Sequence, residues 1–406
     1  IVLTGSYETA LLFKKWNPSL RLLAETSGKN SIVVTASADI DAAVKDIVDS
    51  AFGHAGQKCS ASSLAIVEQS IYNNPTFFKQ LKDAVTSLKV GDPADFSTSV
   101  GPLISPVNKN LSKVIEELEE GEEWLVEPKQ LESVYLWSPG VKINVQPGSW
   151  AHQNEWFGPV LGVMNAKDLE QAVDWQNSVP YGLTAGIQSL NEKECEYWIE
   201  NVEAGNLYVN RTTTGAVVDR HPFGGWKKSS FGPTAKTGGD HYVSMFREYQ
   251  PVENIESLKY EFKLTWEEIG NKSLKLGDTE SERNFKRYVP YKSILLVTEE
   301  DFSKDLESFI FWISELLNIS IKIISEDTLL SPDSNLDLSL FEKIRWTATS
   351  QEIPTQIFNS GATVDERGLS QNGKQELLCW LKEQSISITN HRYGNIGSGP
   401  QPFKDW

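Results

Sequence analysis

Apolar side chains recur at helical spacing through residues 41–52 of this chain, at positions 43, 44, 47, 48 and 52. This spacing predicts an amphipathic helix. Gly53 and Gly56 predict the end of that helix, and the apolar run Ser63–Val67 predicts a strand. Cys59 therefore falls on a loop between a helix and a strand, where a rigid scaffold commonly holds reactive groups.

The alternation of helical and strand-like patterns continues along the chain. Further helices are predicted at 79–90, 111–120, 168–178 and 193–202, and strands at 184–190 and 205–210. Near residue 250 the pattern weakens and acidic residues cluster. After it, an apolar run at 293–297, helical spacing at 301–317 and a second apolar run at 319–325 predict a β-α-β unit. The predicted fold class is α/β, a sheet with covering helices.

Charge and composition restrict the classes of partner. Asp and Glu number 55 against 38 Lys and Arg, a net charge of −17, which argues against nucleic acid or an anionic membrane surface as the main partner. No apolar run approaches the roughly 18 residues that a membrane helix needs, so we expect no membrane insertion. The five histidines lack metal-ligand spacing, so we expect no metal site.

The chain has three cysteines, at positions 59, 195 and 379. They are too few and too scattered for a disulfide framework, which suits a reducing compartment. Cys195 lies in LNEKECEYWIE (190–200) and Cys379 in QELLCWLKE (375–383), and both segments show helical spacing. Both cysteines are interpreted as packing residues. A lone cysteine is more often an inert core residue than a nucleophile, so the interpretation of Cys59 depends on its context.

Four motifs supply that context. Glu25 lies in ETSGKN, Cys59 in GQKC, and Glu155 and Phe157 in NEWFGP, and Pro222 begins the stretch PFGG. In this order the motifs resemble the aldehyde dehydrogenase superfamily over residues 1–250. The resemblance implies an aldehyde dehydrogenase fold: the C-terminal part of a Rossmann-like NAD domain, a catalytic α/β domain, and a smaller α/β domain at the C-terminus.

Three details resemble one branch, the pyrroline-5-carboxylate (L-glutamate γ-semialdehyde) dehydrogenases. They are Ser60 after Cys59, the loop TGAVV at 214–218, and KTGGDHY at 236–242, which departs from that branch at Thr237 and Asp240. Residues 282–297 and 374–395 resemble the C-terminal region of a family within this branch, the bifunctional bacterial flavoproteins called proline utilisation A. In its longer members that region is noncatalytic.

The resemblance assigns roles to particular residues. Cys59 is the expected nucleophile, which forms a thiohemiacetal and then a thioester, and Glu25 is the expected base for water. NAD is the expected hydride acceptor, with Glu155 and Phe157 at its nicotinamide end. Thr4, Gly5 and Ser6 form the turn expected to face the pyrophosphate. Taken alone, this tripeptide also fits a plain turn.

The expected substrate is L-glutamate γ-semialdehyde, oxidised to L-glutamate in proline catabolism. By resemblance, Ser60 and the backbone N–H groups of Gly215 and Ala216 grip its α-carboxylate, although a plain glycine turn is an alternative for Gly215. Two other functions stay open: an aldehyde dehydrogenase of other specificity, and a noncatalytic interaction module. An intact Cys59, Glu25 and Glu155 argues against the second.

We expect three regions: 1–24 as a remnant of the NAD-binding domain, 25–250 as the catalytic domain, and 251–406 as a noncatalytic α/β domain. The chain begins with Ile1 inside an apparent strand, so we expect a fragment that is inactive alone. The family's oxyanion-binding Asn would precede Ile1. A cytoplasmic homo-oligomer is expected, with fusion to an upstream proline dehydrogenase domain as an open question. FAD would belong to that domain and not to this chain.

Overall fold

The structure is a computed structural model of the 406-residue chain. It describes residues 1–233, 235–247, 250–277, 279–349, 352–389, 391–393 and 395–396. The chain divides into two compact units. The first comprises residues 1–27, 222–276 and 285–385, and the second comprises 28–221, 277–284 and 386–406.

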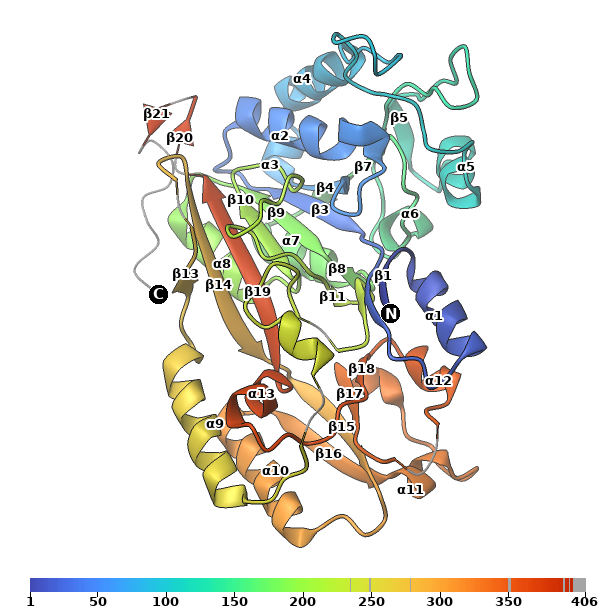
Figure 1. Ribbon diagram of the computed structural model, residues 1–406. Coiled ribbons are helices and arrows are strands. Elements are labelled where there is room, and N and C mark those ends of the chain that lie inside the picture. Colours follow the sequence, from blue (N-terminus) through green and yellow to red (C-terminus); the bar gives the residue numbers. More distant parts are fainter. Residues whose placement is uncertain are drawn as a thin grey trace. The chain divides into compact units, whose positions relative to one another are not determined.

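The second unit is built on one mixed sheet (Figure 1). Its strands β10, β9, β3, β4, β7 and β6 run parallel in that order, and β5 pairs antiparallel with β6. All five residues of β3 are buried, which is typical of a parallel strand covered on both faces. Helices α2 and α7 pack on this sheet. The predicted α/β class is confirmed.

The elements of the second unit are β3 Asn30–Val34, α2 Ile40–Phe52, η1 Gly53–Gly56, β4 Ser62–Glu68, α3 Gln69–Tyr72, α4 Pro75–Thr86, α5 Lys109–Glu116, β5 Glu123–Val126, β6 Gly140–Ile143, α6 Trp150–Gln153, β7 Val160–Ala166, α7 Leu169–Asn177, β8 Tyr181–Gly182, β9 Thr184–Gln188, α8 Glu192–Asn201, β10 Asn206–Val209, β20 His391–Arg392 and β21 Asn395–Ile396.

The segment predicted to present Cys59 folds as expected. Asp39 caps α2 by accepting hydrogen bonds from the N–H groups of Asp41 and Ala42. The apolar face of α2 is buried, and the helix ends at Phe52. A short 3₁₀ turn follows, and β4 begins at Ser62. The loop between helix and strand therefore carries Cys59, which confirms the prediction from hydrophobic spacing.

The elements of the first unit are β1 Val2–Thr4, α1 Tyr7–Trp16, β2 Leu23–Glu25, β11 Trp226–Lys227, β12 Ser230–Phe231, η2 Val243–Phe246, α9 Ile255–Ile269, β13 Leu274–Lys275, β15 Ser293–Thr298, α10 Lys304–Leu317, β16 Ser320–Ser325, α11 Glu326–Leu330, η3 Leu338–Leu340, β17 Lys343–Trp346, α12 Thr355–Phe358, β18 Thr363–Asp365 and α13 Gly373–Leu378. Strands β14 Glu282–Pro290 and β19 Leu381–Thr389 contribute residues to both units.

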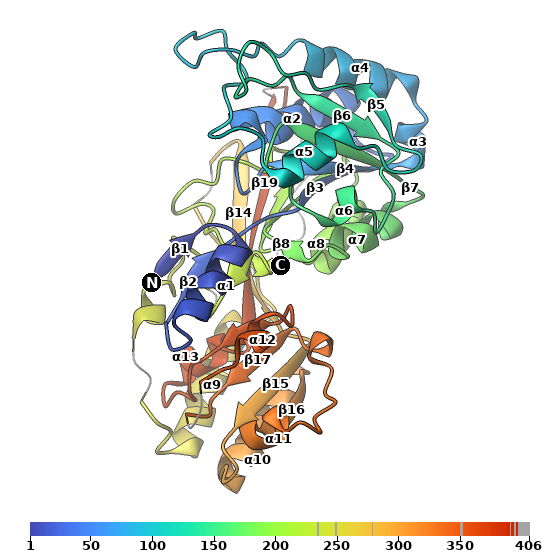
Figure 2. The ribbon, with the colours of Figure 1, turned by 90° about the vertical axis from the view of Figure 1, so that its right-hand side faces the viewer.

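A four-stranded parallel sheet in the order β16-β15-β17-β18 organises the first unit. Its strands are labelled in Figure 1, and Figure 2 shows β15, β16 and β17 from another side. Strand β15 alternates between two cores. Leu295 and Val297 pack in one with Tyr7 and Trp346, whereas Ile294 and Leu296 pack in the other with residues of α9 and α10. Because β15 and β16 are parallel and joined by α10, the predicted β-α-β unit is confirmed.

One predicted element is wrong in part. The helical pattern around Cys379 was expected to continue through residue 383, but α13 ends at Leu378, and β19 begins at Leu381. Cys379 is the C-cap of α13. Alternation in LKEQSISIT suits a strand, and β19 lies between β14 and β10 in the sheet. Pairing with strands distant in sequence thus overrides the local helical spacing.

The two units do not follow the predicted boundaries at residues 24 and 250, because residues 222–276 group with the C-terminal segments. The grouping follows spatial contacts and does not test a division by catalytic role, so that division stays a prediction. None of the helices in the described part of the chain is long and apolar enough to cross a membrane.

Candidate active site

The backbone just before Cys59 adopts an uncommon conformation. His54 and Ala55 have φ angles of 56° and 55°, and Gly56 follows with φ of 67°. Left-handed backbone is costly for residues with a Cβ and persists only where the surroundings enforce it. This run reverses the chain after α2, and Cys59 lies three residues later, half-buried in the loop.

Three consecutive carbonyl groups fix the Cys59 loop. The side-chain amide of Asn30 donates to the carbonyl oxygens of Cys59 at 2.7 Å and Ala61 at 2.9 Å. The hydroxyl of Thr213 donates to the carbonyl oxygen of Ser60 at 3.0 Å. Asn30 is itself held, because its side-chain oxygen accepts from the N–H of Thr184 at 3.0 Å. The loop is therefore preorganised from β3, β9 and the segment after β10.

The proposed carboxylate-binding groups begin next to this anchor. Ser60 is 5% exposed, and its hydroxyl has no hydrogen-bond partner among the described residues. Its carbonyl contact with Thr213 places it beside the start of the loop that carries Gly215 and Ala216. Gly215 has φ of 86°, which favours glycine. Gly215 and Ala216 are both exposed, and their N–H groups donate to none of the described residues.

Glu155 and Phe157 lie on the loop after α6. A carboxylate oxygen of Glu155 accepts from the N–H of Gly28 at 3.0 Å. The carbonyl oxygen of Phe157 accepts from the side-chain amide of Gln57 at 3.2 Å, and Phe157 has φ of 53°. A Cβ on Gly28 would lie 2.6 Å from the carbonyl oxygen of Cys59. Only glycine therefore allows this close approach of the Cys59 loop and the backbone that holds Glu155.

Glu25 belongs to the first unit, at the end of β2. One carboxylate oxygen accepts from the N–H of Gly225 at 3.1 Å. Burial raises the pKa of Glu25 to about 8, while the positive charge of Lys236 and the Gly225 hydrogen bond act in the opposite direction. Lys236 is buried, and its ammonium donates to the carbonyl oxygen of Gly224 at 2.6 Å. A carboxyl with its pKa near neutrality suits a general base.

The turn Thr4, Gly5 and Ser6 adjoins Glu25 within the first unit. Thr4 pairs with Glu25 in the parallel strands β1 and β2, and the N–H of Gly5 donates to the carbonyl oxygen of Glu25 at 3.2 Å. Ser6 caps α1 by accepting from the N–H of Thr9. In this conformation Gly5 offers no N–H to a phosphate. The positive end of α1 stays oriented at the turn, as the sequence predicts.

The structure brings the predicted residues together in two groups. Cys59, Ser60, Glu155, Phe157 and the 215–216 loop lie in the second unit, and Glu25 with the Thr4–Ser6 turn lies in the first. Sequence reasoning missed Asn30 and Lys236. Asn30 opens a fully buried strand, and a polar residue there is a signal that could have identified it. Lys236 lies in the KTGGDHY motif, but nothing in the neighbouring sequence indicates its interaction with Glu25.

The other two cysteines fit the packing interpretation. Both are buried, and burial raises the pKa of the Cys195 thiol to about 12. Burial also raises the pKa of Cys379. Neither thiol is activated as a nucleophile. No group of three His, Cys, Asp or Glu that could hold a metal ion occurs in the described part of the chain.

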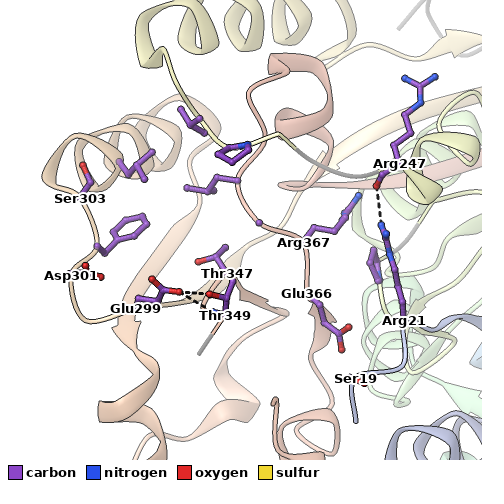
Figure 3. Close-up of a pocket in the computed structure, with 17 residues that line it drawn as sticks. Ser19, Arg21, Arg247, Glu299, Asp301, Ser303, Thr347, Thr349, Glu366 and Arg367 are labelled. Atoms are coloured by element: carbon purple, nitrogen blue, oxygen red, sulfur yellow. Dashed lines mark hydrogen bonds between the residues drawn. The ribbon is translucent and has the colours of Figure 1, made fainter. Parts of the chain in front are cut away.

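A separate cavity of about 930 Å³ lies in the first unit, past the carboxyl ends of β15, β17 and β18 (Figure 3). Its polar groups are largely engaged with the protein. Glu299 accepts from the N–H and hydroxyl of Thr349 at 3.2 and 2.6 Å. Arg367 is held by the buried Asp365 through two nitrogens. None of the predicted site residues lines this cavity.

Comparison with known proteins places these observations in a family. The model of the aldehyde dehydrogenase family matches residues 1–252. A 1-pyrroline-5-carboxylate dehydrogenase of Geobacillus sp. (strain WCH70) is 38% identical over 237 residues, which cover 58% of this chain and 45% of that protein. The chain thus spans less than half the length of this curated relative.

Solved structures agree with the predicted fold. Proline utilisation A from Corynebacterium freiburgense superposes with a TM-score of 0.86 at 40% identity, over 98% of this chain and 42% of that one. A Thermus 1-pyrroline-5-carboxylate dehydrogenase with bound NAD gives a TM-score of 0.55 at 37% identity, over 61% of this chain and 49% of that one. The expected aldehyde dehydrogenase fold is therefore confirmed, and the first neighbour extends the likeness to the C-terminal region.

Proposed function

This chain belongs to the aldehyde dehydrogenase family, and we propose that the protein carrying it oxidises L-glutamate γ-semialdehyde to L-glutamate with NAD. The observation that carries the proposal is the Cys59 loop, in which three successive carbonyl groups are fixed by side chains of other strands and loops. Such a loop holds a thiol in a defined place while leaving it partly accessible. The names of the similar proteins support the same reaction.

Cys59 acts as the nucleophile. Its thiolate adds to the aldehyde carbon, and the bond that forms gives a thiohemiacetal. NAD, when bound, supplies the hydride acceptor that converts this adduct to a thioester. Glu25 then takes a proton from water, the hydroxide adds to the thioester carbonyl, and the carbon–sulfur bond breaks to give the acid and a free Cys59 thiolate.

The residues present fit such a cofactor. Glu155 would hold hydroxyl groups of the nicotinamide ribose, because its carboxylate is fixed by the Gly28 N–H, and Phe157 would pack at the nicotinamide end. The first turn of α1, with Thr4 and Ser6, would face the pyrophosphate through the positive end of the helix. Gly5 would contribute its lack of a side chain, since its N–H is already engaged.

The substrate α-carboxylate would be bound by Ser60 and by the N–H groups of Gly215 and Ala216. Two observations support this assignment. The Cys59 loop and the segment before Gly215 are joined by the hydrogen bond from Thr213 to the carbonyl oxygen of Ser60. The Ser60 hydroxyl and the two N–H groups make no hydrogen bonds within the described part of the chain. Three hydrogen-bond donors around one carboxylate should give a substrate with that charge a much higher kcat/KM than a simple aldehyde. An aldehyde dehydrogenase of other specificity is the alternative, in which these groups would give no such advantage.

We further propose the setting in which the chain works. Residues 251–406 would form a noncatalytic domain, and the protein would be a cytoplasmic homo-oligomer. A proline dehydrogenase domain fused upstream would bind FAD, outside this chain. The likeness to proline utilisation A over 98% of the chain supports this arrangement. The open reading frame that encodes the chain would show directly whether an upstream domain exists.

Steady-state kinetics with two aldehydes test the proposed function. The protein as its open reading frame encodes it would be assayed for NADH formation with L-glutamate γ-semialdehyde and with propanal, which lacks the carboxylate. We expect kcat/KM to favour the first substrate by at least roughly a hundredfold, as for a site that hydrogen-bonds its substrate. Equal values would support the alternative specificity, and no turnover with either aldehyde would support a noncatalytic module.

A further inference from the structure

We propose that His221 is a positioning residue that holds the 214–218 loop in the conformation in which Gly215 and Ala216 face the substrate carboxylate. This inference rests on the proposed function. The loop runs from Thr214 to Val218 and is exposed at its tip. His221, three residues after the loop, is 5% exposed.

Two hydrogen bonds between Val217 and His221 close the loop. The backbone N–H of His221 donates to the carbonyl oxygen of Val217 at 2.8 Å. In return the N–H of Val217 donates to Nδ1 of the His221 ring at 2.9 Å. Val217 directly follows Ala216 in sequence, so the second bond fixes the peptide next to the two proposed donors. On its N-terminal side the loop is held through Thr213.

The geometry also assigns the tautomer of His221. Because a backbone N–H can only donate, Nδ1 must be the unprotonated acceptor, and the proton lies on Nε2. Nε2 lies 2.9 Å from the side-chain oxygen of Asn284, which accepts a hydrogen bond from Nε2–H. The Ser387 hydroxyl lies 3.1 Å from Nε2. A guanidinium nitrogen of Arg211 lies 3.3 Å from Nε2 and donates at the shorter distance of 2.7 Å to Glu282. The neutral ring therefore uses both nitrogens, one toward the loop and one toward β14.

A polar network from β14 and β19 holds Asn284 in place. Its side-chain oxygen also accepts from the hydroxyl of Ser387 at 2.7 Å, and its amide nitrogen donates to the carbonyl oxygen of Gly277 at 2.7 Å. Arg211, which precedes the loop, donates to Glu282 at 2.7 Å and to the Ser387 hydroxyl. All these residues belong to the second unit.

This network gives residues beyond 276 a role in substrate choice. Glu282, Asn284 and Ser387 lie outside the segment matched by the family model, yet they orient the ring that fixes the loop. Without the ring, the peptide at Val217 would lose its acceptor, and the N–H groups of Gly215 and Ala216 would no longer be held toward one point. Binding of a carboxylate would weaken, whereas addition of Cys59 to an aldehyde would not.

The variants His221→Leu and His221→Asn test the assignment. Leucine removes both ring nitrogens. Asparagine keeps a hydrogen-bond acceptor close to the position of Nδ1, because Nδ1 of histidine and the side-chain oxygen of asparagine are both bonded to Cγ. A matched control is His152→Leu, since His152 is also buried and its Nδ1 also accepts the backbone N–H four residues earlier, from Gly148 at 2.9 Å.

We expect His221→Leu to raise KM for L-glutamate γ-semialdehyde roughly tenfold, the loss of about one hydrogen-bonded anchor, with kcat and the KM for propanal little changed. His221→Asn should restore most of the lost affinity, and His152→Leu should leave the ratio between the two aldehydes unchanged. A wild-type ratio in His221→Leu, or equal losses in the leucine and asparagine variants, would overturn the assignment.

The failure of this inference differs from the failure of the proposed function. If the wild-type enzyme itself does not prefer the carboxylate-bearing aldehyde, the proposed function is wrong. Should His221→Leu fail to fold, hydrogen exchange in the wild-type protein still decides. The Val217 amide should be protected, while the amides of Gly215 and Ala216 exchange quickly and become protected when L-glutamate is added. An unprotected Val217 amide would overturn the inference.

Discussion

The side-chain amide nitrogen of Asn30 lies 2.7 Å from the carbonyl oxygen of Cys59. The same nitrogen also reaches the carbonyl oxygen of Ala61, and the side-chain oxygen accepts from the N–H of Thr184. One buried amide at the start of β3 thus connects the Cys59 loop with β9. The position of the Cys59 backbone depends on a residue 29 positions earlier in the chain.

We predict that Asn30→Ala lowers both stability and kcat. The variant leaves two carbonyl oxygens and one N–H without this partner in a buried place, and each costs about 1–3 kcal/mol when unsatisfied. Urea unfolding measures the first effect, and NADH formation the second. Asn201→Ala, at an exposed site on α8, is the control and should stay within about 0.5 kcal/mol of wild type. A stable Asn30→Ala enzyme with unchanged kcat would show that the anchor is dispensable.

Replacement of Cys59, the proposed nucleophile, should separate folding from turnover. Cys59→Ser should keep the wild-type circular dichroism spectrum and lose NADH formation, because a hydroxyl is a far weaker nucleophile than a thiolate at neutral pH. Cys195→Ser and Cys379→Ser serve as controls and should retain kcat, although each puts a hydroxyl into a buried place. Retention of most activity in Cys59→Ser would rule out the proposed mechanism.

Ser60→Ala tests the hydroxyl of the proposed carboxylate site. Loss of one hydrogen bond to a charged group should cost roughly 1.5 to 3 kcal/mol in kcat/KM for L-glutamate γ-semialdehyde, with little change for propanal. The measurement is the ratio of kcat/KM values for the two aldehydes. An equal loss with both would mean that Ser60 acts on the position of Cys59 and not on the carboxylate.

The pKa of Glu25 predicts the pH dependence of turnover. Burial raises that pKa to about 8. Because the base acts in its deprotonated form, kcat should rise with pH up to about this value wherever thioester hydrolysis limits turnover. The positive charge of Lys236 lowers the pKa of Glu25, so Lys236→Met should move the rising limb to higher pH.

A pH profile of kcat for wild type and Lys236→Met provides the measurement. Lys228→Met, which removes a lysine on the neighbouring loop, controls for the general loss of positive charge. A limb that stays in place in Lys236→Met would show that Lys236 does not interact with Glu25 during turnover. A limb that moves equally in both variants would assign the effect to net charge alone.

Local patterns were sufficient to predict α2, β4 and the loop that carries Cys59. The helix has a clear apolar face, an aspartate cap and glycines at its end, and these signals act within a few residues. The β-α-β unit at 293–325 was predicted for the same reason, because both strands are apolar runs and the helix between them is amphipathic.

Contacts between distant segments could not be predicted in this way. His221 meets Asn284 63 residues later and Ser387 166 residues later, and nothing in the local spacing of either partner marks the contact. The segment after Cys379 had helical spacing but forms part of β19, because pairing in the sheet outweighs local preference. The family motifs located Glu25, but its raised pKa follows from burial that the sequence does not report.

A rapid-quench experiment on Glu25→Gln tests the central claim most directly. Without the base, hydrolysis of the thioester should become limiting, so that mixing with NAD and L-glutamate γ-semialdehyde gives a burst of NADH close to one per active site. Peptide mass spectrometry after acid quenching should then locate the acyl group on Cys59. A burst with the acyl group on Cys59 is the predicted result. An acyl group on another residue, or rapid turnover without a burst, would contradict the assignment of Cys59 as nucleophile and Glu25 as base.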